Sequence, residues 1–287
     1  MTYILLLVAV VIWGSTFVAT KICLDHMSTL QLVASRFVIA APMLYLVARL
    51  RGASFGFSAL ARPLTIGAGI FSVHFLIQTW ALEFTTATNS GWIVAVTPLT
   101  IAIMAMLVLK EAIPPAMRAG LVIATFGVVL LVSRGELASL DWLSSAGDWL
   151  MLLSTVTWAL YTVLTRDLSR ACDPVVIAFA MTLPLGAVAL VLPFALDDWT
   201  QLRSLPLDAL FALIFLGLGG VALAQWFWQT GVVLLGAAKA GLFLYLEPLT
   251  TTALAVPLLG EPFGLTGALG GLLVLASVFV AQRRSAA

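Results

Sequence analysis

Apolar residues fill this chain in long blocks, separated by short stretches of polar residues, glycine or proline. A hydrocarbon core about 30 Å thick is crossed by roughly 20 apolar helical residues, and each block has about that length. Ten blocks can be marked, at about residues 3–22, 30–49, 63–82, 86–109, 115–134, 147–166, 174–194, 206–230, 236–259 and 264–282. The pattern therefore predicts an all-α integral membrane protein with ten transmembrane helices.

Local signals mark where several of these helices begin. Ser28 and Gln31 have the spacing of a capping box before the second block, and Ser145 and Asp148 stand in the same way before the sixth. An Asp-Pro pair at residues 173–174 is typical of an N-cap followed by proline at the first helical position. These signals predict helix starts close to the block boundaries.

The chain contains a long internal repeat. Residues 239–261 (KAGLFLYLEPLTTTALAVPLLGE) align without a gap to residues 89–111 (NSGWIVAVTPLTIAIMAMLVLKE), which lie 150 positions earlier. A second match, at an offset of 145, places Trp13 beside Trp158. Repeats of this length indicate a duplicated half-protein. We divide the chain into a first five-helix repeat, residues 1–143, and a second, residues 144–287.

Lysine and arginine are distributed unevenly between the two ends of the predicted helices. With the N-terminus inside, nine fall at inner ends and three at outer ends. The inner residues are Arg49, Arg51, Arg62, Lys110, Arg118, Arg166, Arg170, Arg283 and Arg284, and the outer ones are Lys21, Arg134 and Arg203. Positive charge gathers on the cytoplasmic side, so both termini are expected there. Because five is odd, the second repeat enters the membrane from the opposite side, which makes the repeat inverted.

Composition agrees with a bilayer protein and excludes other classes. With 62% hydrophobic and 9% charged residues and a mean hydropathy of +1.12, there is too little polar surface to coat a soluble globule. A net charge of +1 argues against nucleic acid as a partner. The two cysteines and two histidines form no metal motif, and nucleotide-binding and hydrolase motifs are absent. We expect no metal, no cofactor and no enzymatic activity.

Aromatic and polar residues share faces on the first and sixth predicted helices. Trp13, Thr16, Phe17 and Thr20 follow the spacing of one helix face, and Trp158, Tyr161, Thr162 and Thr165 repeat it in the second half. Such stripes are commonly packing surfaces, and the alternative is a cavity wall. Preservation of the pattern between the two copies leaves both readings open.

Further candidates lie on the third, fourth and ninth predicted helices. Phe71, His74 and Gln78 share one side of the third helix, where His74 either bonds a neighbouring helix or faces a substrate. Asn89 and Trp92 share a face of the fourth helix. On the ninth, Lys239 and Phe243 share a face, and Lys239 alternatively extends to the cytoplasm as an orienting charge.

Proline and one carboxylate stand out inside the repeated segment. Pro98 and Pro248 each remove a backbone donor and should bend their helices near mid-membrane, either for architecture or to expose backbone to a ligand. Glu247 at this depth must be protonated, paired or facing water, and Arg36 and Lys239 are its possible partners. Glu111 and Glu261 are interpreted as helix-boundary residues.

Several segments resemble a known family. WGSTFVATK in the first helix, the Arg36-Phe37 pair, TPLTIAIMAMLVLKE and LEPLTTTALAVPLLGE resemble the EamA-type members of the drug/metabolite transporter superfamily, and among them the bacterial aromatic amino acid exporters. The resemblance implies a central cavity between helices one to four and six to nine, with five and ten peripheral. It also implies the bacterial inner membrane, and export as the direction of transport.

Together these observations suggest an alternating-access exporter of small amphipathic metabolites, foremost aromatic or bulky apolar amino acids, that acts as a monomer in the lipid bilayer. The expected cavity lining is Trp13, Phe71, His74, Gln78, Asn89, Trp92, Trp158, Tyr161, Lys239 and Phe243. Export of cationic drugs is the alternative that Glu247 keeps open. A membrane-embedded enzyme is a further alternative, although no nucleophile, acid pair or metal set supports it. A purely structural membrane protein is disfavoured by the inverted repeat.

Overall fold

The computed structural model describes residues 2–55, 61–110, 115–133, 145–165, 172–191, 202, 204–236 and 240–282. All regular secondary structure in these ranges is helical. Within the first half the helices are α1 (Thr2–Leu24), α2 (Thr29–Leu50), α3 (Ala61–Phe84), α4 (Ala87–Val94), α5 (Thr97–Leu109) and α6 (Pro115–Val132).

The second half begins with α7 (Ala146–Leu164) and α9 (Pro174–Val191). Next comes a long rod composed of α11 (Leu207–Ile214), the π-helical segment η4 (Phe215–Leu223) and α12 (Ala224–Leu235). The 3₁₀ segment η5 (Leu242–Leu246) precedes α14 (Glu247–Leu259), and α15 (Leu265–Gln282) follows. Each predicted apolar block thus contains a helix, and the fourth, eighth and ninth blocks hold helices of more than one segment or type.

Length and exposure of the helices agree with a multi-pass membrane protein. Among the described residues, five helical stretches are long and apolar enough to cross a bilayer: Thr2–Leu24, Thr29–Leu50, Thr65–Phe84, Ala87–Val108 and Leu207–Leu235. Large apolar side chains such as Leu46, Phe126, Phe211 and Phe279 lie exposed on the outside of the helices. In water such a surface would be unfavourable, whereas hydrocarbon accepts it.

The predicted helix starts are found where the caps indicated. Ser28 and Gln31 form a reciprocal capping box at the start of α2. The Ser145 hydroxyl accepts a hydrogen bond from the backbone N–H of Asp148 at 3.2 Å. At α9, an oxygen of Asp173 accepts from the N–H of Val175 at 3.0 Å, which satisfies one of the donors that a helix start leaves free.

Both predicted proline bends are interruptions of the helix. α4 ends at Val94, and α5 restarts at Thr97 with Pro98 in its first turn. In the repeat-related position, the 3₁₀ segment η5 ends at Leu246, and α14 starts at Glu247 with Pro248 in its first turn. Because proline lacks an N–H, the preceding turn loses a hydrogen bond and the helix direction can change there.

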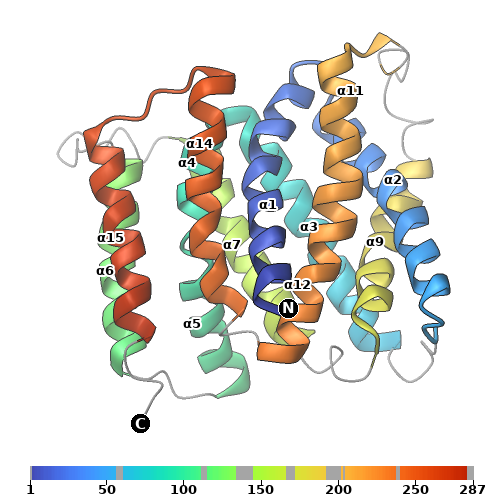
Figure 1. The fold of residues 1–287 in the computed structure, drawn as a ribbon, viewed down its shortest axis with the longest axis horizontal. Helices are drawn as coiled ribbons and strands as arrows, with labels where there is room; N and C mark the ends of the chain where they lie inside the picture. Colours follow the sequence, from blue (N-terminus) through green and yellow to red (C-terminus); the bar gives the residue numbers. More distant parts are fainter. Residues whose placement is uncertain are drawn as a thin grey trace.

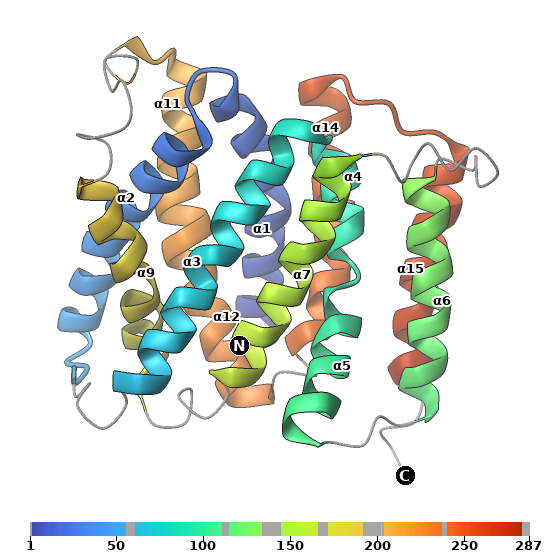
Figure 2. The same cartoon turned by 180° about the vertical axis from the view of Figure 1, so that it is seen from behind.

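The helices form a main bundle and a peripheral pair. α6 and α15 pack against each other at one edge of the molecule, as Figures 1 and 2 show, and contact α4 and η5 of the main bundle. A Cβ placed on Gly127 of α6 would lie 2.8 Å from the Gly270 carbonyl of α15, so these two backbones are nearly in contact. The start of α1 and the end of α15 both lie toward the lower end of the bundle in Figure 1.

Glu261 has a role that its position at a helix boundary did not reveal. Its two carboxylate oxygens accept hydrogen bonds from the backbone N–H groups of Ala87 at 2.8 Å and Thr88 at 2.7 Å. These are the first residues of α4, where the helix dipole favours negative charge. A residue that follows α14 thereby holds the start of a helix in the other half of the chain.

We expect Glu261→Ala to lower the free energy of unfolding by about 2–3 kcal/mol, because two hydrogen bonds to a charged group are lost at a helix N-terminus. Thermal unfolding of the detergent-purified protein measures this loss. Glu83→Ala is the control, since exposed Glu83 accepts from the Thr29 hydroxyl at the end of α3 and should contribute little. Equal effects of the two variants would contradict the capping role.

Candidate functional site

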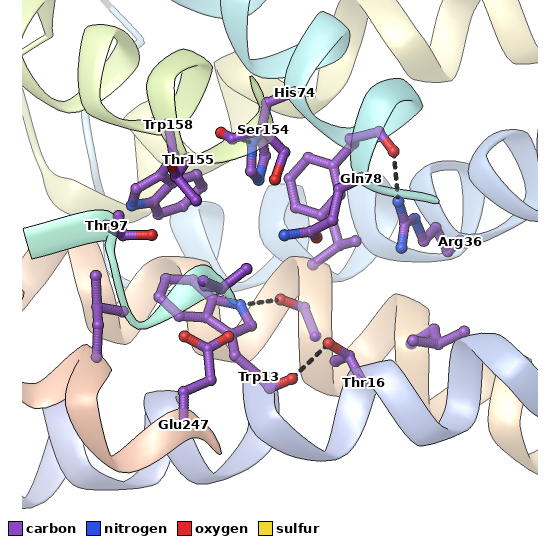
Figure 3. A pocket seen from close by; sticks show the side chains of 16 residues that line it. Trp13, Thr16, Arg36, His74, Gln78, Thr97, Ser154, Thr155, Trp158 and Glu247 are labelled. Carbon is purple, nitrogen blue, oxygen red and sulfur yellow. Dashed lines mark hydrogen bonds between the residues drawn. The ribbon is translucent and has the colours of Figure 1, made fainter. Parts of the chain in front are cut away.

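A narrow cavity lies in the middle of the main bundle, where segments from both halves of the chain meet. Figure 3 shows the side chains around it. The lining residues are Trp13, Thr16, Arg36, His74, Phe75, Gln78, Val94, Thr97, Ser154, Thr155, Trp158, Leu216, Gly220, Val221, Leu244 and Glu247. They come from α1, α2, α3, the junction of α4 and α5, α7, η4, η5 and the first residue of α14.

Repeat-related residues face one another across this cavity. Trp13 and Trp158, which correspond at the offset of 145, meet edge to face with ring centroids 5.3 Å apart and an interplanar angle of 85°. At the offset of 150, Thr97 corresponds to Glu247, and both line the cavity immediately before a proline. The cavity therefore forms where the equivalent segments of the two halves come together.

Indole rings form one wall of the cavity. Trp228 packs behind the two lining tryptophans, with its ring centroid 5.4 Å from Trp13 and 6.0 Å from Trp158. The Trp13 indole N–H donates to the Gly220 carbonyl in the π-helical segment at 3.0 Å. The indole N–H of Trp158 is buried and has no hydrogen-bond partner in the structure. An unsatisfied donor at a cavity wall is a place where a ligand or water can bond.

The cavity is small in this conformation. Its volume is about 40 Å³. One water needs roughly 10–15 Å³ of cavity, so the cavity admits a few waters but not an aromatic amino acid. A substrate of that size requires the surrounding helices to move apart.

Glu247 lies in this wall with its carboxylate unpaired. The residue is 4% exposed, and Figure 3 shows its carboxylate directed toward the indole of Trp13. In the described part of the chain this carboxylate makes no hydrogen bond and no ion pair. The sequence left three options for Glu247: protonation, pairing with Arg36 or Lys239, or contact with water. The structure shows no pairing with Arg36. Lys239, the other possible partner, lies outside the described residues.

Arg36 is satisfied only in part, at a separate position of the cavity. One guanidinium nitrogen, Nη2, donates to the Thr79 hydroxyl at 2.7 Å, and the guanidinium carbon lies 4.6 Å from the centroid of the Phe75 ring. Its Nε is buried without a partner. In Figure 3 Arg36 and Glu247 lie well apart, so an acidic and a basic group are available at different ends of the same space.

His74 and Gln78 lie between these two groups on α3. His74 Nδ1 is 2.9 Å from the Ser154 carbonyl, which can only accept, so Nδ1 carries the hydrogen and Nε2 is the acceptor of the neutral ring. Gln78 is partly buried and makes no hydrogen bond with the described residues. Both side chains can therefore bond a molecule in the cavity.

Two of the other expected lining residues lie behind the aromatic wall. Phe71 is fully buried, with its ring centroid 4.7 Å from Phe75 and 5.1 Å from Tyr161. The Tyr161 hydroxyl accepts hydrogen bonds from the side-chain amides of Gln225, at 2.8 Å, and Gln229. These residues support Trp158 from behind and do not reach the cavity.

Trp92 also lies away from the cavity, contrary to the expected lining. Its indole N–H donates to the Thr252 hydroxyl at 3.0 Å, and its ring lies nearly parallel to that of Phe263, at 6° and 6.3 Å between centroids. The reason is helical geometry. Val94 faces the cavity, and two residues are about 200° apart around a helix, so Trp92 points to the opposite side.

The remaining expected residues do not meet in the cavity. Asn89 lies in the first turn of α4, where its backbone N–H donates to the Thr86 hydroxyl at 3.1 Å. Phe243 packs on Tyr3 with ring centroids 6.1 Å apart, while the next residue, Leu244, lines the cavity. Lys239 lies outside the described residues. The cavity thus contains Trp13, His74, Gln78 and Trp158 from the expected set.

Several residues that line the cavity were not among the predicted site residues. Ser154 and Thr155 are one turn before Trp158, and Thr97 has a buried hydroxyl without a partner. A usable signal existed for Thr97, because it precedes Pro98 as Glu247 precedes Pro248. The π-helical segment, by contrast, follows from tertiary packing of a glycine-rich stretch, where a Cβ on Gly217 would lie 2.6 Å from an Ile39 side-chain carbon.

Comparison with known proteins agrees with this architecture. A model of the EamA-like transporter family matches residues 1–133 and 145–282. The uncharacterized transporter YyaM of Bacillus subtilis is 28% identical, over 98% of this chain and 93% of that protein. An uncharacterized transporter of Archaeoglobus fulgidus is 29% identical, over 97% and 96%.

Two further comparisons concern a named activity and the fold. A probable terminal-alkyne amino-acid exporter of Streptantibioticus cattleyicolor is 26% identical, over 98% of this chain and 93% of that protein. A solved crystal structure superposes with a TM-score of 0.73 and 20% identity, and the match covers 98% of this chain and 96% of that one. At that identity the superposition shows that the fold is shared.

Proposed function

This chain belongs to the EamA-like transporter family, and from that premise we propose that it exports small amphipathic metabolites, foremost aromatic or bulky apolar amino acids, by alternating access. The family indicates a transporter rather than an enzyme. The observation that carries the substrate proposal is the cavity itself: indole walls with an unpaired acidic group and a partly satisfied basic group at separate positions.

Alternating access is supported by how the two halves meet. We propose ten transmembrane helices in two inverted five-helix repeats, residues 1–143 and 144–287. The start of α1 and the end of α15 lie toward the same end of the bundle, as an even number of crossings requires (Figure 1). Trp13 meets its counterpart Trp158 at the centre. Two inverted copies can exchange conformations and open such a site first to one side and then to the other.

The polar groups of the cavity are complementary to an amino acid zwitterion. Glu247 and Nε2 of His74 are acceptors for an ammonium group. Arg36 and the Gln78 amide are donors for a carboxylate. The tryptophan rings suit an apolar or aromatic side chain. A sugar phosphate would need several cationic groups. Among the described lining residues, Arg36 is the one that carries a positive charge, so the cavity fits a sugar phosphate poorly.

Counterflow in proteoliposomes tests this function. Vesicles containing the protein are loaded with one unlabelled compound and exposed to a labelled one, using phenylalanine, leucine, lysine, phenethyltrimethylammonium and glucose 6-phosphate. We expect exchange of phenylalanine and leucine. Exchange restricted to the sugar phosphate, or no exchange with any compound, would overturn the proposal.

Export of cationic drugs is a second candidate, which one observation favours. The Glu247 carboxylate lies beside the Trp13 indole, and aromatic faces together with a carboxylate attract organic cations. Exchange of phenethyltrimethylammonium without phenylalanine exchange would select this candidate. The amino acid proposal is preferred because Arg36 and Gln78 would otherwise face the cavity without an anionic partner.

The expected orientation places both termini in the cytoplasm of a bacterial cell, on the grounds of the lysine and arginine distribution. C-terminal fusions to alkaline phosphatase and to green fluorescent protein measure it. We expect a fluorescent and phosphatase-inactive fusion at Ala287. Phosphatase activity there would reverse the assignment of the two faces.

His74 and Gln78 are expected to act in recognition of the carboxylate and ammonium. We expect His74→Leu with Gln78→Leu to leave an inserted protein that no longer distinguishes phenylalanine from phenethylamine, because unpaired ionic groups would cost several kcal/mol on leaving water. Competition of both ligands against labelled phenylalanine measures this. His26→Leu, which removes the other histidine outside this cavity, is the control. Retained discrimination by a stable double variant would place recognition elsewhere.

A further inference from the structure

We propose that the Glu247 carboxylate is an exchange site, which a proton and the cationic nitrogen of the substrate occupy in turn, so that the protein is a proton/substrate antiporter. This rests on the proposed export function and adds its coupling ion. The geometry points to it. Glu247 is the acidic side chain that lines the described cavity, it is 4% exposed, and it has no hydrogen-bond or ion-pair partner there.

An unpaired carboxylate in this position cannot remain empty and charged at low cost. A charge buried at membrane depth is unfavourable unless it is neutralised, paired or solvated. The cavity has room for only a few waters, fewer than surround a carboxylate in open water. The low-energy states of Glu247 are therefore the protonated acid and the ion pair with a cationic ligand.

Among the residues that the structure describes, no charged or titratable group around Glu247 neutralises it. On α1, which approaches α14 at Gly14, the titratable residues are Tyr3, Lys21 and Cys23, each at least seven positions from Gly14. α4 carries none, and in η5 the titratable residue is Tyr245, which is buried. Across the cavity, Arg36 bonds Thr79, and His74 bonds Ser154 through Nδ1. Lys239 lies outside the described residues.

The repeat makes the site single and asymmetric. The counterpart of Glu247 in the first half is Thr97, whose buried hydroxyl is neutral. One carboxylate at the junction of two otherwise corresponding segments gives one exchangeable charge per molecule. Occupancy by a proton and by an ammonium group then exclude each other, and each weakens the binding of the other by the same factor.

The charge balance of the cycle follows from this single site. A zwitterion leaves the cell bound to the negative carboxylate, and the carrier returns with the carboxyl protonated. One neutral zwitterion then moves out for one proton moved in, so one positive charge enters per cycle. A permanent monocation without a carboxylate also exchanges for one proton, but the charges cancel and the exchange is electroneutral.

The experiment uses purified protein in vesicles whose membrane potential is set with valinomycin and potassium, with a pH-sensitive dye to record proton movement. We expect about one proton to enter for each phenylalanine that leaves. This proton/phenylalanine exchange should be faster when the side of the membrane that receives the protons is negative. Exchange of phenethyltrimethylammonium should move one proton per cation and be insensitive to the potential. As the pH is lowered through the range in which the carboxyl takes up its proton, the apparent affinity for phenylalanine should fall by up to about tenfold per pH unit.

Glu247→Gln keeps the shape of the side chain and removes both the charge and the exchangeable proton. We expect it to abolish proton movement, to remove the pH dependence of phenylalanine binding, and to weaken that binding at least tenfold. Glu247→Asp, which retains a carboxylate, should restore proton movement. Glu83→Gln removes an exposed acidic group outside the cavity and should behave as wild type. Thermal unfolding of each variant verifies folding.

The outcomes separate this inference from the proposed function. Net phenylalanine efflux by the wild-type protein without proton movement, or proton-coupled efflux by Glu247→Gln, would overturn the exchange site and leave the exporter intact. Absence of counterflow with every compound would overturn both. Proton movement that requires a carboxylate at position 247 supports the inference.

Discussion

Trp158→Ala is expected to reduce aromatic amino acid transport far more, per folded molecule, than Trp92→Ala does. The Trp158 ring contacts Trp13 at 5.3 Å and His74 at 4.9 Å between centroids, and it lines the cavity. Trp92 is as deeply buried, but it stacks on Phe263 outside the cavity. Both variants should lose about 3–5 kcal/mol of stability, since each removes a buried indole.

Substrate binding separates the two. Loss of an aromatic partner costs about 0.5–1.5 kcal/mol beyond area burial, so Trp158→Ala should weaken phenylalanine binding several-fold or more, and Trp92→Ala should leave it near wild type. Isothermal titration on the folded fraction, together with counterflow, measures this. Trp158→Phe should recover part of the affinity. Equal losses of affinity in the two alanine variants would return Trp92 to the candidate binding residues.

Gly14→Ala is expected to destabilise the protein by about 1–3 kcal/mol and to lower transport, through overpacking of α1 against α14. A Cβ at Gly14 would lie 2.6 Å from the Glu247 carbonyl and 2.8 Å from the Thr250 Cβ. The Gly14 carbonyl also accepts from the Thr251 hydroxyl at 2.9 Å, so the two backbones are held at this distance. A methyl group there must displace the backbone that carries Glu247.

Gly69→Ala is the matched control for this prediction. Gly69 lies in α3, and a Cβ there would meet no atom within 4 Å. The substitution should be neutral or stabilise by about 0.4–1 kcal/mol, since it restricts the unfolded chain. Thermal unfolding and phenylalanine counterflow measure both variants. Wild-type stability and transport in Gly14→Ala would show that α1 and α14 can separate at no cost.

The predictions for Trp158→Ala and Gly14→Ala both concern the contact between the first and the second half of the chain. Gly14 of α1 touches the start of α14, and Gly91 of α4 would place a Cβ 2.9 Å from the Thr251 side chain of the same helix. α14 therefore packs closely against two helices of the first half. In the proposed mechanism these contacts bring the prolyl junctions, Trp13 and Glu247 together, and they must loosen before the narrow cavity can admit a substrate.

Much of the architecture could be predicted because it depends on local chemistry. Block length follows from the thickness of the bilayer, and the caps at Ser28 and Asp173 act within one turn of their helices. The interruptions at Pro98 and Pro248 follow from a missing N–H. The peripheral pair α6 and α15 agrees with what the family resemblance implied (Figures 1 and 2).

The cavity lining could be predicted only in part. Trp13, His74, Gln78 and Trp158 were expected there and line it, whereas Trp92, Asn89, Phe71, Tyr161 and Phe243 lie elsewhere. A shared helix face shows which residues point the same way, but not which direction meets the centre of the bundle. In α4, helix geometry separates Val94 and Trp92 by about 200°, and packing against the neighbouring helices decides that Val94 is the one that faces inward.

The sequence by itself determined the apolar helices and their starts, because these depend on neighbouring residues and on composition. The duplication into two inverted halves and the orientation stay predictions. Only the tertiary structure decided that Glu261 caps α4 and that Trp13 meets Trp158. It also showed that Glu247 faces a narrow cavity and has no partner among the described residues. These features join residues that lie more than 100 positions apart, and their distances depend on how closely the helix backbones pack, as at Gly14. Helix periodicity gives the direction of a side chain within its own helix, whereas packing between helices determines what that side chain meets.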